Sequence, residues 1–181
     1  MRFGMLASLV AAVLAFAGTA VAADKENTLY IDLKDGRVEI EMRPDLAPLH
    51  VAQIKKLARE GKYDGVVFHR VIEGFMAQTG DPAGTGRGGM GDTLKAEFSK
   101  EKHVRGTVSM ARTNDPNSAR SQFFIVFKDS DFLDNKYTVW GKVTKGMEFV
   151  DKIKRGDPNS GEVAAPQDKM IKVRVAADVK S

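Results

Sequence analysis

The sequence predicts a mainly β domain, either an antiparallel barrel or a sandwich, with two helices packed against it. Short apolar segments with the alternation of strands are separated by turn residues along most of the chain. Only two segments have helical periodicity, and they lie far apart in the sequence, which argues against alternating βαβ units. The 181 residues are enough for one domain with a substantial core.

The first predicted elements are a hairpin and a helix. Residues 29–33 and 38–42 alternate apolar and polar side chains, as half-buried strands do, and an Asp-Gly pair at 35–36 suits the tight turn between them. Pro48 is well placed to open a helix, and Gly61 to end it. The apolar residues of this helix form a single stripe: Val51, Ile54, Leu57 and Ala58.

The rest of the chain supplies further strands and a second helix. Runs rich in β-branched and other apolar residues predict strands at 66–72, 75–79, 106–111, 122–127, 138–143 and 171–177. We expect Thr144 to cap a helix, and its apolar face is formed by Met147, Val150 and Ile153. The segments 80–91 and 156–168 are predicted to be loops.

Composition excludes several classes of protein. Hydrophobic residues make up 43% of the chain and charged residues 29%, which is ordinary for a soluble globular protein. The net charge of +4 is scattered without a basic run, so nucleic-acid binding is not predicted. The chain has no cysteine, which rules out disulfides, thiolate catalysis and cysteine-based zinc sites. Its three histidines are too scattered to predict a metal site.

Residues 1–23 are predicted to be a secretory signal peptide. Arg2 precedes an apolar run at 6–16, and small residues at 20–23 form a cleavage site before the charged Asp24. An uncleaved membrane anchor is the alternative, but a membrane span needs roughly 20 apolar residues. We therefore expect a mature domain at 24–181 without a stable membrane anchor, located in a bacterial periplasm, where disulfides can form but are not required.

Two features remain ambiguous when their residues are considered alone. The segment 84–89 matches the G-x-G-x-x-G pattern, but it lies neither after a strand nor before a helix, so we do not predict a dinucleotide site. Arg70 shares a predicted strand face with Phe68 and Ile72, and burying an unpaired charge is costly. Arg70 is therefore either an edge-strand residue in a surface ion pair or part of a functional site.

A longer pattern around Arg70 resembles a known family. Residues 68–81 read F-H-R-V-I-E-G-F-M-A-Q-T-G-D, which closely resembles the cyclophilin signature F-H-R-x-I-x-G-F-M-x-Q-x-G-D. Further blocks resemble that family in the same order, and they lie at 84–86, 108–111, 121–125, 132–134 and 140–143. The similarity covers residues 27–178, and the compact length is most like the exported bacterial branch.

The resemblance implies a closed eight-stranded antiparallel barrel capped by two α-helices. It also implies isomerisation of X-Pro peptide bonds without a cofactor or metal, acting on proline-containing unfolded or partly folded polypeptides, and we expect a monomer. At the position of Arg70, the family uses a guanidinium to donate a hydrogen bond to the prolyl nitrogen, whose lone pair becomes available only as the amide twists. A proline-binding chaperone with little catalysis is the alternative, which the presence of Arg70 and Gln78 disfavours.

The resemblance further assigns the residues that bind substrate, with Arg70 as the catalytic residue. The expected substrate-binding residues are Phe75, Met76, Gln78, Ala111, Gln122, Phe124, Phe132, Leu133 and Tyr137. Each of them also has a plain packing explanation, and this explanation is strongest for Met76 and Phe124. Phe132 stands where many eukaryotic relatives have Trp, Tyr137 where many have His, and Arg112 where Asn is common. Because Phe lacks the indole donor, we predict weak binding of cyclosporin.

Overall fold

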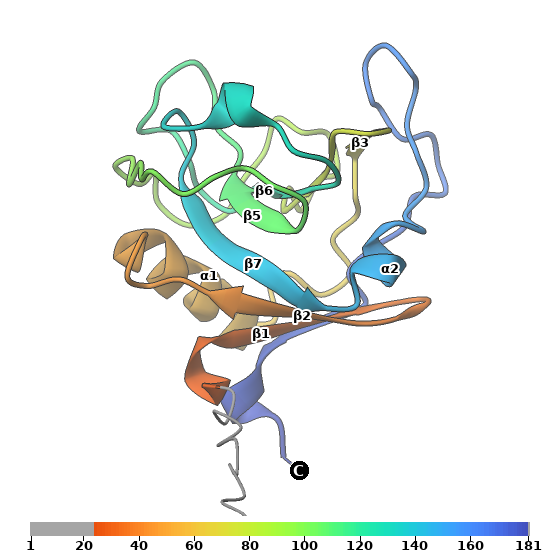
Figure 1. Ribbon diagram of the computed structural model, residues 1–181. Coiled ribbons are helices and arrows are strands. Elements are labelled where there is room, and N and C mark those ends of the chain that lie inside the picture. Colours follow the sequence, from red (N-terminus) through yellow and green to blue (C-terminus); the bar gives the residue numbers. More distant parts are fainter. Residues whose placement is uncertain (1–23, 181) are drawn as a thin grey trace, which may run out of the picture.

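The computed structural model of the protein describes residues 24–180, and the predicted signal peptide at 1–23 lies outside them (Figure 1). The strands are β1 (Thr28–Leu33), β2 (Gly36–Met42), β3 (Arg70–Ile72), β4 (Met76–Thr79), β5 (Thr107–Met110), β6 (Phe123–Val126), β7 (Val139–Lys145) and β8 (Lys172–Val175). The α-helices are α1 (Pro48–Arg59) and α2 (Met147–Val150). Short 3₁₀ turns occur at η1 (Lys25–Asn27), η2 (Asp131–Leu133) and η3 (Ala176–Asp178). The prediction of a mainly β domain with two helices is confirmed.

The eight strands form one antiparallel sheet, but the prediction of a closed barrel is wrong. The strand order is β3-β4-β6-β5-β7-β2-β1-β8, so β3 and β8 are the edges of an open, curled half-barrel. Only isolated bridges span the gap, and they join Val67 to Lys169 and Arg70 to Glu162. The segment that faces β3 there contains Pro166. Because proline has no N–H to donate, a regular ladder cannot continue along this segment.

The concave side of the sheet encloses the main core, with α1 and α2 on opposite sides of it in Figure 1. The predicted alternation of the first hairpin is confirmed, because its apolar residues are buried and Ile31 lies opposite Val38. Large aromatic rings fill the centre. Phe123 meets Trp140 edge to face, with 5.3 Å between ring centroids, and Tyr63 donates its hydroxyl proton to the carbonyl of Ser121 at 2.9 Å.

The two helices begin in different ways. Pro48 occupies the first turn of α1, and Gly61 follows its end in the left-handed region, with φ of 67°, both as predicted. The predicted cap of the second helix is wrong: Thr144 belongs to β7, which continues to Lys145 because that residue still pairs with Glu39. Gly146 makes the turn into α2 with φ of 81°, where an added Cβ would lie 2.3 Å from the Arg37 carbonyl oxygen. Within residues 24–180, neither helix has the length and apolarity needed to cross a membrane.

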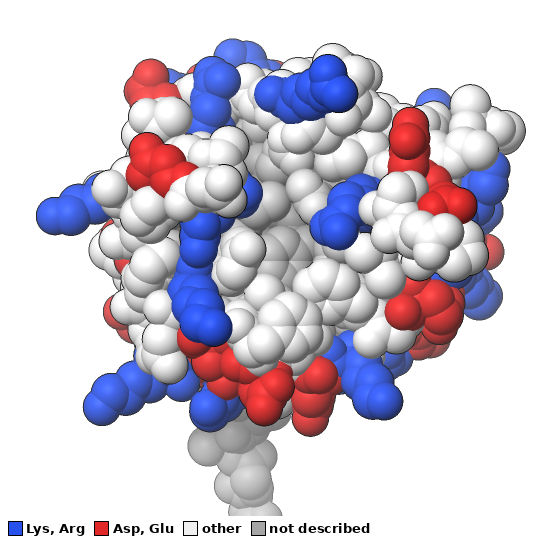
Figure 2. Space-filling view, turned by 90° about the horizontal axis from the view of Figure 1, so that it is seen from above, with Lys and Arg blue, Asp and Glu red and all other residues white. Residues whose placement is uncertain are grey.

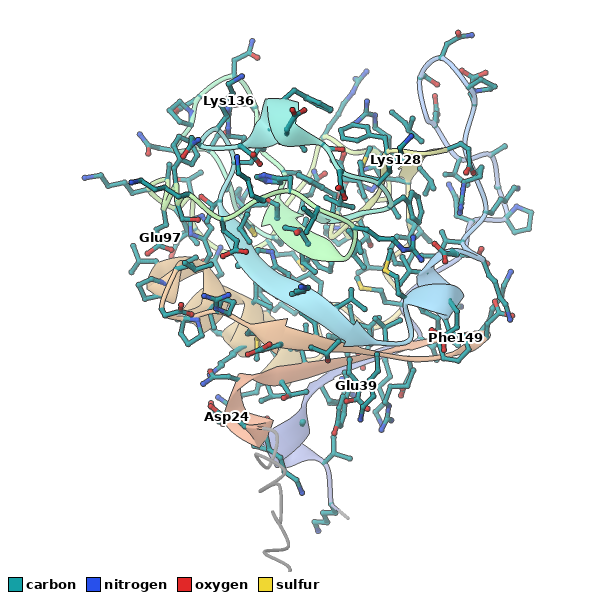
Figure 3. The ribbon with its side chains drawn as sticks, in the orientation of Figure 1. Asp24, Glu39, Glu97, Lys128, Lys136 and Phe149 are labelled. Carbon is teal, nitrogen blue, oxygen red and sulfur yellow. The ribbon has the colours of Figure 1, made fainter. Side chains whose placement is uncertain are left out.

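A carboxylate from a distant loop caps α1. The preceding residue, Ala47, makes no side-chain cap. Glu97 instead accepts hydrogen bonds from the N–H groups of Leu49 and His50, both at 3.1 Å, and contacts Nδ1 of the buried His50 at 2.6 Å. Figure 3 shows Glu97 beside this helix. The negative charge thus lies at the positive end of the helix dipole and satisfies N–H groups that lack partners within the helix.

Replacing Glu97 with alanine is expected to lower the free energy of unfolding by about 1.5 kcal/mol, because the helix loses its cap and His50 loses a partner. Urea unfolding measures the change. Glu101→Ala is the control, because the carboxylate of Glu101 is more exposed and lies 3.8 Å from Arg43. Equal effects of the two substitutions would contradict the capping role.

Candidate active site

Three neighbouring strands place Arg70, Gln78 and Phe124 side by side. Arg70 lies opposite Gln78 in the β3–β4 pair, and Gln78 lies opposite Phe124 in the β4–β6 pair. Directly opposed residues of antiparallel strands project from the same face of a sheet. The intervening Val71 and Ala77 are fully buried in the main core, so these three side chains point away from it.

Phe68 does not share the face of Arg70 and Ile72, contrary to the sequence prediction. β3 begins only at Arg70, so the strict alternation does not extend back to residue 68. Phe68 belongs to the main core, whereas Ile72 packs against the apolar cluster on the other face.

A groove of about 450 Å³ lies over this outer face. Nine of the ten predicted site residues line it, and only Gln122 does not. The complete lining is Arg70, Phe75, Met76, Gln78, Ala111, Arg112, Phe124, Phe132, Leu133, Lys136 and Tyr137. Figure 2 looks down on the hollowed face at the top of Figure 1, and Figure 3 places Lys136 at this end of the molecule.

The floor of the groove is a small apolar cluster that is separate from the main core. Met76, Phe124, Val126 and Leu133 are its buried members, each at most 5% exposed. Phe75, Ala111 and Tyr137 are half-buried around them, together with Ile72. A shallow apolar basin next to a cation suits a ring that is apolar on its carbons and carries one polar nitrogen.

Phe132 lies at the rim of the groove. It is 57% exposed, and its ring is tilted against that of Phe75, with 5.4 Å between centroids. A phenyl ring at this position offers no N–H donor to a bound ligand. Weak binding of cyclosporin therefore stays a prediction, and inhibition of the isomerase at nanomolar drug would contradict it.

Arg70 is held by the backbone and not by a carboxylate. Its Nε donates to the carbonyl of Ser160 at 3.1 Å, and within residues 24–180 it forms no ion pair. The two terminal nitrogens have no hydrogen-bond partner in this part of the chain. A half-buried guanidinium with free donors is costly in an apolar setting unless a ligand uses them. The ion-pair explanation of Arg70 is therefore not supported.

Gln78 and Gln122 connect the groove to the glycine-rich loop. Nε2 of Gln78 donates to Oε1 of Gln122 at 2.9 Å, and Nε2 of Gln122 donates to the carbonyls of Gly86 and Gly88 at 3.0 and 2.7 Å. Gln122 thus lines the neighbouring hollow. The Oε1 atom of Gln78, with its amide held in this way, is left to accept a hydrogen bond from a ligand.

The glycine-rich loop folds around the carboxylate of Asp81. This side chain is fully buried and accepts hydrogen bonds from the N–H groups of Ala83, Thr85, Gly86 and Gly88 at 2.8–3.2 Å. Burial alone would raise the pKa of Asp81, but these bonds outweigh it and lower the pKa to about 2. The N–H groups that could hold a phosphate are thus already occupied, which agrees with rejecting a dinucleotide site.

A line of buried polar groups supports the floor of the groove from below. Nδ1 of His103 contacts Asp134 at 3.1 Å and its Nε2 contacts Oγ of Ser109 at 3.1 Å. A hydrogen bond from Lys102 and one from the His103 N–H lower the pKa of Asp134 to about 2, whereas burial lowers the pKa of His103. Ser109 and His103 are at most 1% exposed, so this line cannot act as a nucleophilic triad. The His103 ring instead stacks on Phe124, with 6.4 Å between centroids.

Arg112 and Lys136 also line the groove, although the sequence did not predict them as site residues. Arg112 donates to the carbonyls of Thr113 and Lys136, and its guanidinium lies 4.5 Å from the centre of the Tyr137 ring. One feature of the sequence could have indicated them, because each is the direct neighbour of a predicted site residue: Arg112 follows Ala111, and Lys136 precedes Tyr137.

Comparison with known proteins agrees with this geometry. The model of the family "Cyclophilin type peptidyl-prolyl cis-trans isomerase/CLD" matches residues 28–175. The chain is 57% identical to a "Probable peptidyl-prolyl cis-trans isomerase" of Brucella suis, over 96% of this chain and 95% of that protein. It is 47% identical to "Peptidyl-prolyl cis-trans isomerase B" of Bacillus subtilis, over 72% of this chain and 92% of that protein.

Solved structures show the same fold. The cyclophilin AquaCyp293 from Hirschia baltica superposes with a TM-score of 0.77 at 32% identity, over 87% of this chain and 76% of that one. A cyclophilin type isomerase from Cryptosporidium parvum, crystallised in the presence of the dipeptide Ala-Pro, superposes with a TM-score of 0.75 at 28% identity, over 82% and 98%. With the groove, the family match and these relatives in agreement, the chain belongs to the cyclophilin-type peptidyl-prolyl cis-trans isomerases and is an isomerase of X-Pro peptide bonds.

Proposed function

We propose that Arg70 is the catalytic residue of this isomerase and that the enzyme assists the folding of exported proteins. The observation that carries the catalytic proposal is the unpaired guanidinium of Arg70 beside the apolar floor of the groove. Rotation about a peptide bond has a barrier of about 18–20 kcal/mol because resonance makes the bond planar. Each tenfold acceleration requires about 1.4 kcal/mol of selective stabilisation of the twisted state.

The chemistry follows from what twisting does to the prolyl nitrogen. In the planar amide its lone pair is delocalised, and in the twisted state the nitrogen becomes pyramidal and can accept a hydrogen bond. A donor from Arg70 therefore acts mainly in the transition state, which is the condition for catalysis. The guanidinium stays protonated and directional, so no proton transfer and no covalent intermediate are needed.

The remaining groove residues would hold the substrate while the bond rotates. The apolar cluster around Met76, Phe124 and Leu133 would fix the pyrrolidine ring, and Oε1 of Gln78 would accept a hydrogen bond from the substrate backbone. Because the His103 ring stacks on Phe124 from below, the floor is supported against displacement. Rotation then takes place in the part of the substrate outside the basin.

Two observations support the role in export. The charge and apolar pattern at 1–23 is that of a cleavable signal peptide. Asp24, the first residue after the expected cleavage site, has a structural role in the described domain: its carboxylate accepts hydrogen bonds from the N–H groups of Glu26 and Asn27 and caps η1.

Fractionation of a Gram-negative bacterium that expresses the full chain tests the proposal. We expect the protein in the periplasmic fraction, with an N-terminus close to Asp24, and we expect that fraction to accelerate refolding limited by X-Pro isomerisation. Val13→Arg, which puts a charge into the apolar run, is the control and should stay in the cytoplasm uncleaved. A cytoplasmic, uncleaved wild-type chain would refute the export role without touching the isomerase activity.

A further inference from the structure

The arginines of the described chain fall into two groups. Six of them contact a carboxylate, and these are Arg37, Arg43, Arg59, Arg105, Arg155 and Arg174. The other four, Arg70, Arg87, Arg112 and Arg120, form no ion pair within residues 24–180. Outside the groove region, every arginine in this part of the chain is paired with an acidic residue.

The four unpaired arginines surround two connected hollows. The first is the groove described above, which Arg70 and Arg112 line together with Lys136. The second, of about 560 Å³, shares Gln78, Ala111 and Arg112 with it and adds Arg87 and Arg120. Among residues 24–180, no Asp or Glu lines either hollow. Figure 2 shows Lys and Arg side chains on both sides of this hollow, with acidic side chains concentrated farther out.

Backbone carbonyls hold three of these guanidinium groups without neutralising them, and the bond of Arg70 to Ser160 is described above. Nε and Nη2 of Arg120 donate to the Gly91 carbonyl at 2.9 and 2.8 Å, and Arg112 donates to the carbonyls of Thr113 and Lys136. A carbonyl satisfies a donor but leaves the net charge in place. The positive charges are thus fixed in position at the groove while remaining available to an anion.

Two acidic groups close to this region do not form ion pairs with its arginines. Asp81 is fully buried in the glycine-rich loop and accepts its hydrogen bonds there. Glu162 lines a third hollow together with Arg70 and Arg87, and within residues 24–180 it forms no ion pair with either arginine. The lining of the groove and of the adjoining hollow therefore carries several cations and no carboxylate among the described residues.

We propose that this enzyme prefers proline segments that carry Asp or Glu within about three residues of the proline. The inference rests on the proposed function, because it takes the groove to be the substrate site. An extended chain advances about 3.3 Å per residue, so three residues span about 10 Å. The second hollow adjoins the first at Gln78, Ala111 and Arg112, so a side chain two or three positions from a proline in the first hollow can reach it. A carboxylate there meets cations that lack any acidic partner, and a lysine is repelled.

Isomerisation of short peptides tests the preference. Peptides with a central Ala-Pro bond and otherwise neutral residues are compared with versions that carry one Glu, Gln or Lys at each of the three positions on either side. At low salt we expect kcat/KM for the best Glu peptide to be about fivefold above that of the Gln peptide with the same substituted position. The kcat/KM of the corresponding Lys peptide should be lower than that of the Gln peptide. The Glu advantage should disappear in about 1 M NaCl, where the screening length falls to roughly 3 Å.

Variants of the second hollow identify the residues responsible. In the double variant Arg87→Gln/Arg120→Gln, the ratio of Glu to Gln peptides should fall to about one while Gln peptides are still turned over. Arg37→Gln, which loses one positive charge on the distant β1–β2 hairpin, is the control and should keep the ratio. A ratio of one in the wild type, or a preference that the double variant retains, overturns the inference. Failure to isomerise even the neutral peptides would instead overturn the proposed function.

Discussion

Replacing Arg70 with alanine is expected to reduce kcat/KM for a neutral X-Pro peptide by about a hundredfold, which is the loss typical of one transition-state hydrogen-bond donor. The hydrogen bond from Arg70 stabilises the transition state selectively, because the lone pair that accepts it is available only in the twisted amide. Removing the donor therefore raises the barrier more than it weakens substrate binding. The measurement compares kcat and KM separately. We expect the loss mainly in kcat, with KM changed little.

Stability controls exclude an indirect effect of this substitution. Arg70 makes one hydrogen bond to a backbone carbonyl and no ion pair in the described chain, so the melting temperature of Arg70→Ala should stay close to that of the wild type. Arg155→Ala is a matched control, because Arg155 pairs with Glu73 and lies over the Phe127 ring outside the groove. Equal rates for wild type and Arg70→Ala would rule out the proposed role and leave Gln78 and the apolar basin as the source of catalysis.

The same comparison addresses the alternative of a proline-binding chaperone with little catalysis. A module that only binds proline segments gains nothing from a donor aimed at a twisting nitrogen. It would lose little refolding activity in Arg70→Ala and much when the apolar floor is disrupted, for example by Phe124→Ala. For an isomerase, kcat should instead fall more in Arg70→Ala than in Phe124→Ala.

Replacing Asp81 with asparagine is expected to lower the free energy of unfolding by about 3 kcal/mol, among the largest effects available outside the main core. One carboxylate oxygen accepts three backbone N–H bonds and the Thr85 hydroxyl, while the other accepts the bond from Ala83. An amide has only one acceptor oxygen, so its NH₂ group must face at least one N–H donor. Urea unfolding at neutral pH measures the loss.

The free energy of unfolding of the wild type at acid pH should also reveal the contribution of the Asp81 carboxylate. The pKa of Asp81 is about 2 in the folded state, below the ordinary value of 3.8. Because the unfolded chain takes up the proton first, this group stabilises the fold above about pH 4 and loses that contribution, on the order of 2 kcal/mol, as the pH falls toward 2. Asp81→Asn should therefore flatten the fall of stability in this range.

Asp157 is a control position that separates the effect of burying the carboxylate from the effect of its hydrogen bonds. Asp157 also accepts backbone N–H bonds, from Asn159 and Ser160, but it is exposed in a surface turn. Asp157→Asn should cost less than about 1 kcal/mol, because water can replace the lost interactions. If the two substitutions had the same effect, the buried loop around Asp81 would not be the source of the stability.

Sequence patterns predicted much of the fold because the signals involved are local. The alternation in β1 and β2, Pro48 at the start of α1 and Gly61 after its end all depend on neighbouring residues, and all are confirmed. Thr144 was wrongly predicted as a cap because the extent of β7 depends on its pairing with β2. The closed barrel was wrong for a similar reason, since whether β3 and β8 meet depends on an irregular segment between them.

For the site, the sequence by itself determined most of the residues that line the groove, because the resemblance runs through contiguous blocks around Arg70, Phe124 and Leu133, although it missed Arg112 and Lys136. Only the tertiary structure decided which charges have partners. Arg120 is held by Gly91 and Arg112 by Lys136, while the arginines elsewhere in residues 24–180 meet carboxylates. Several of these contacts join residues that are distant in the chain, such as Arg120 with Gly91 and Arg174 with Asp64. The energy of a charge depends on what surrounds it in space, which no local pattern records.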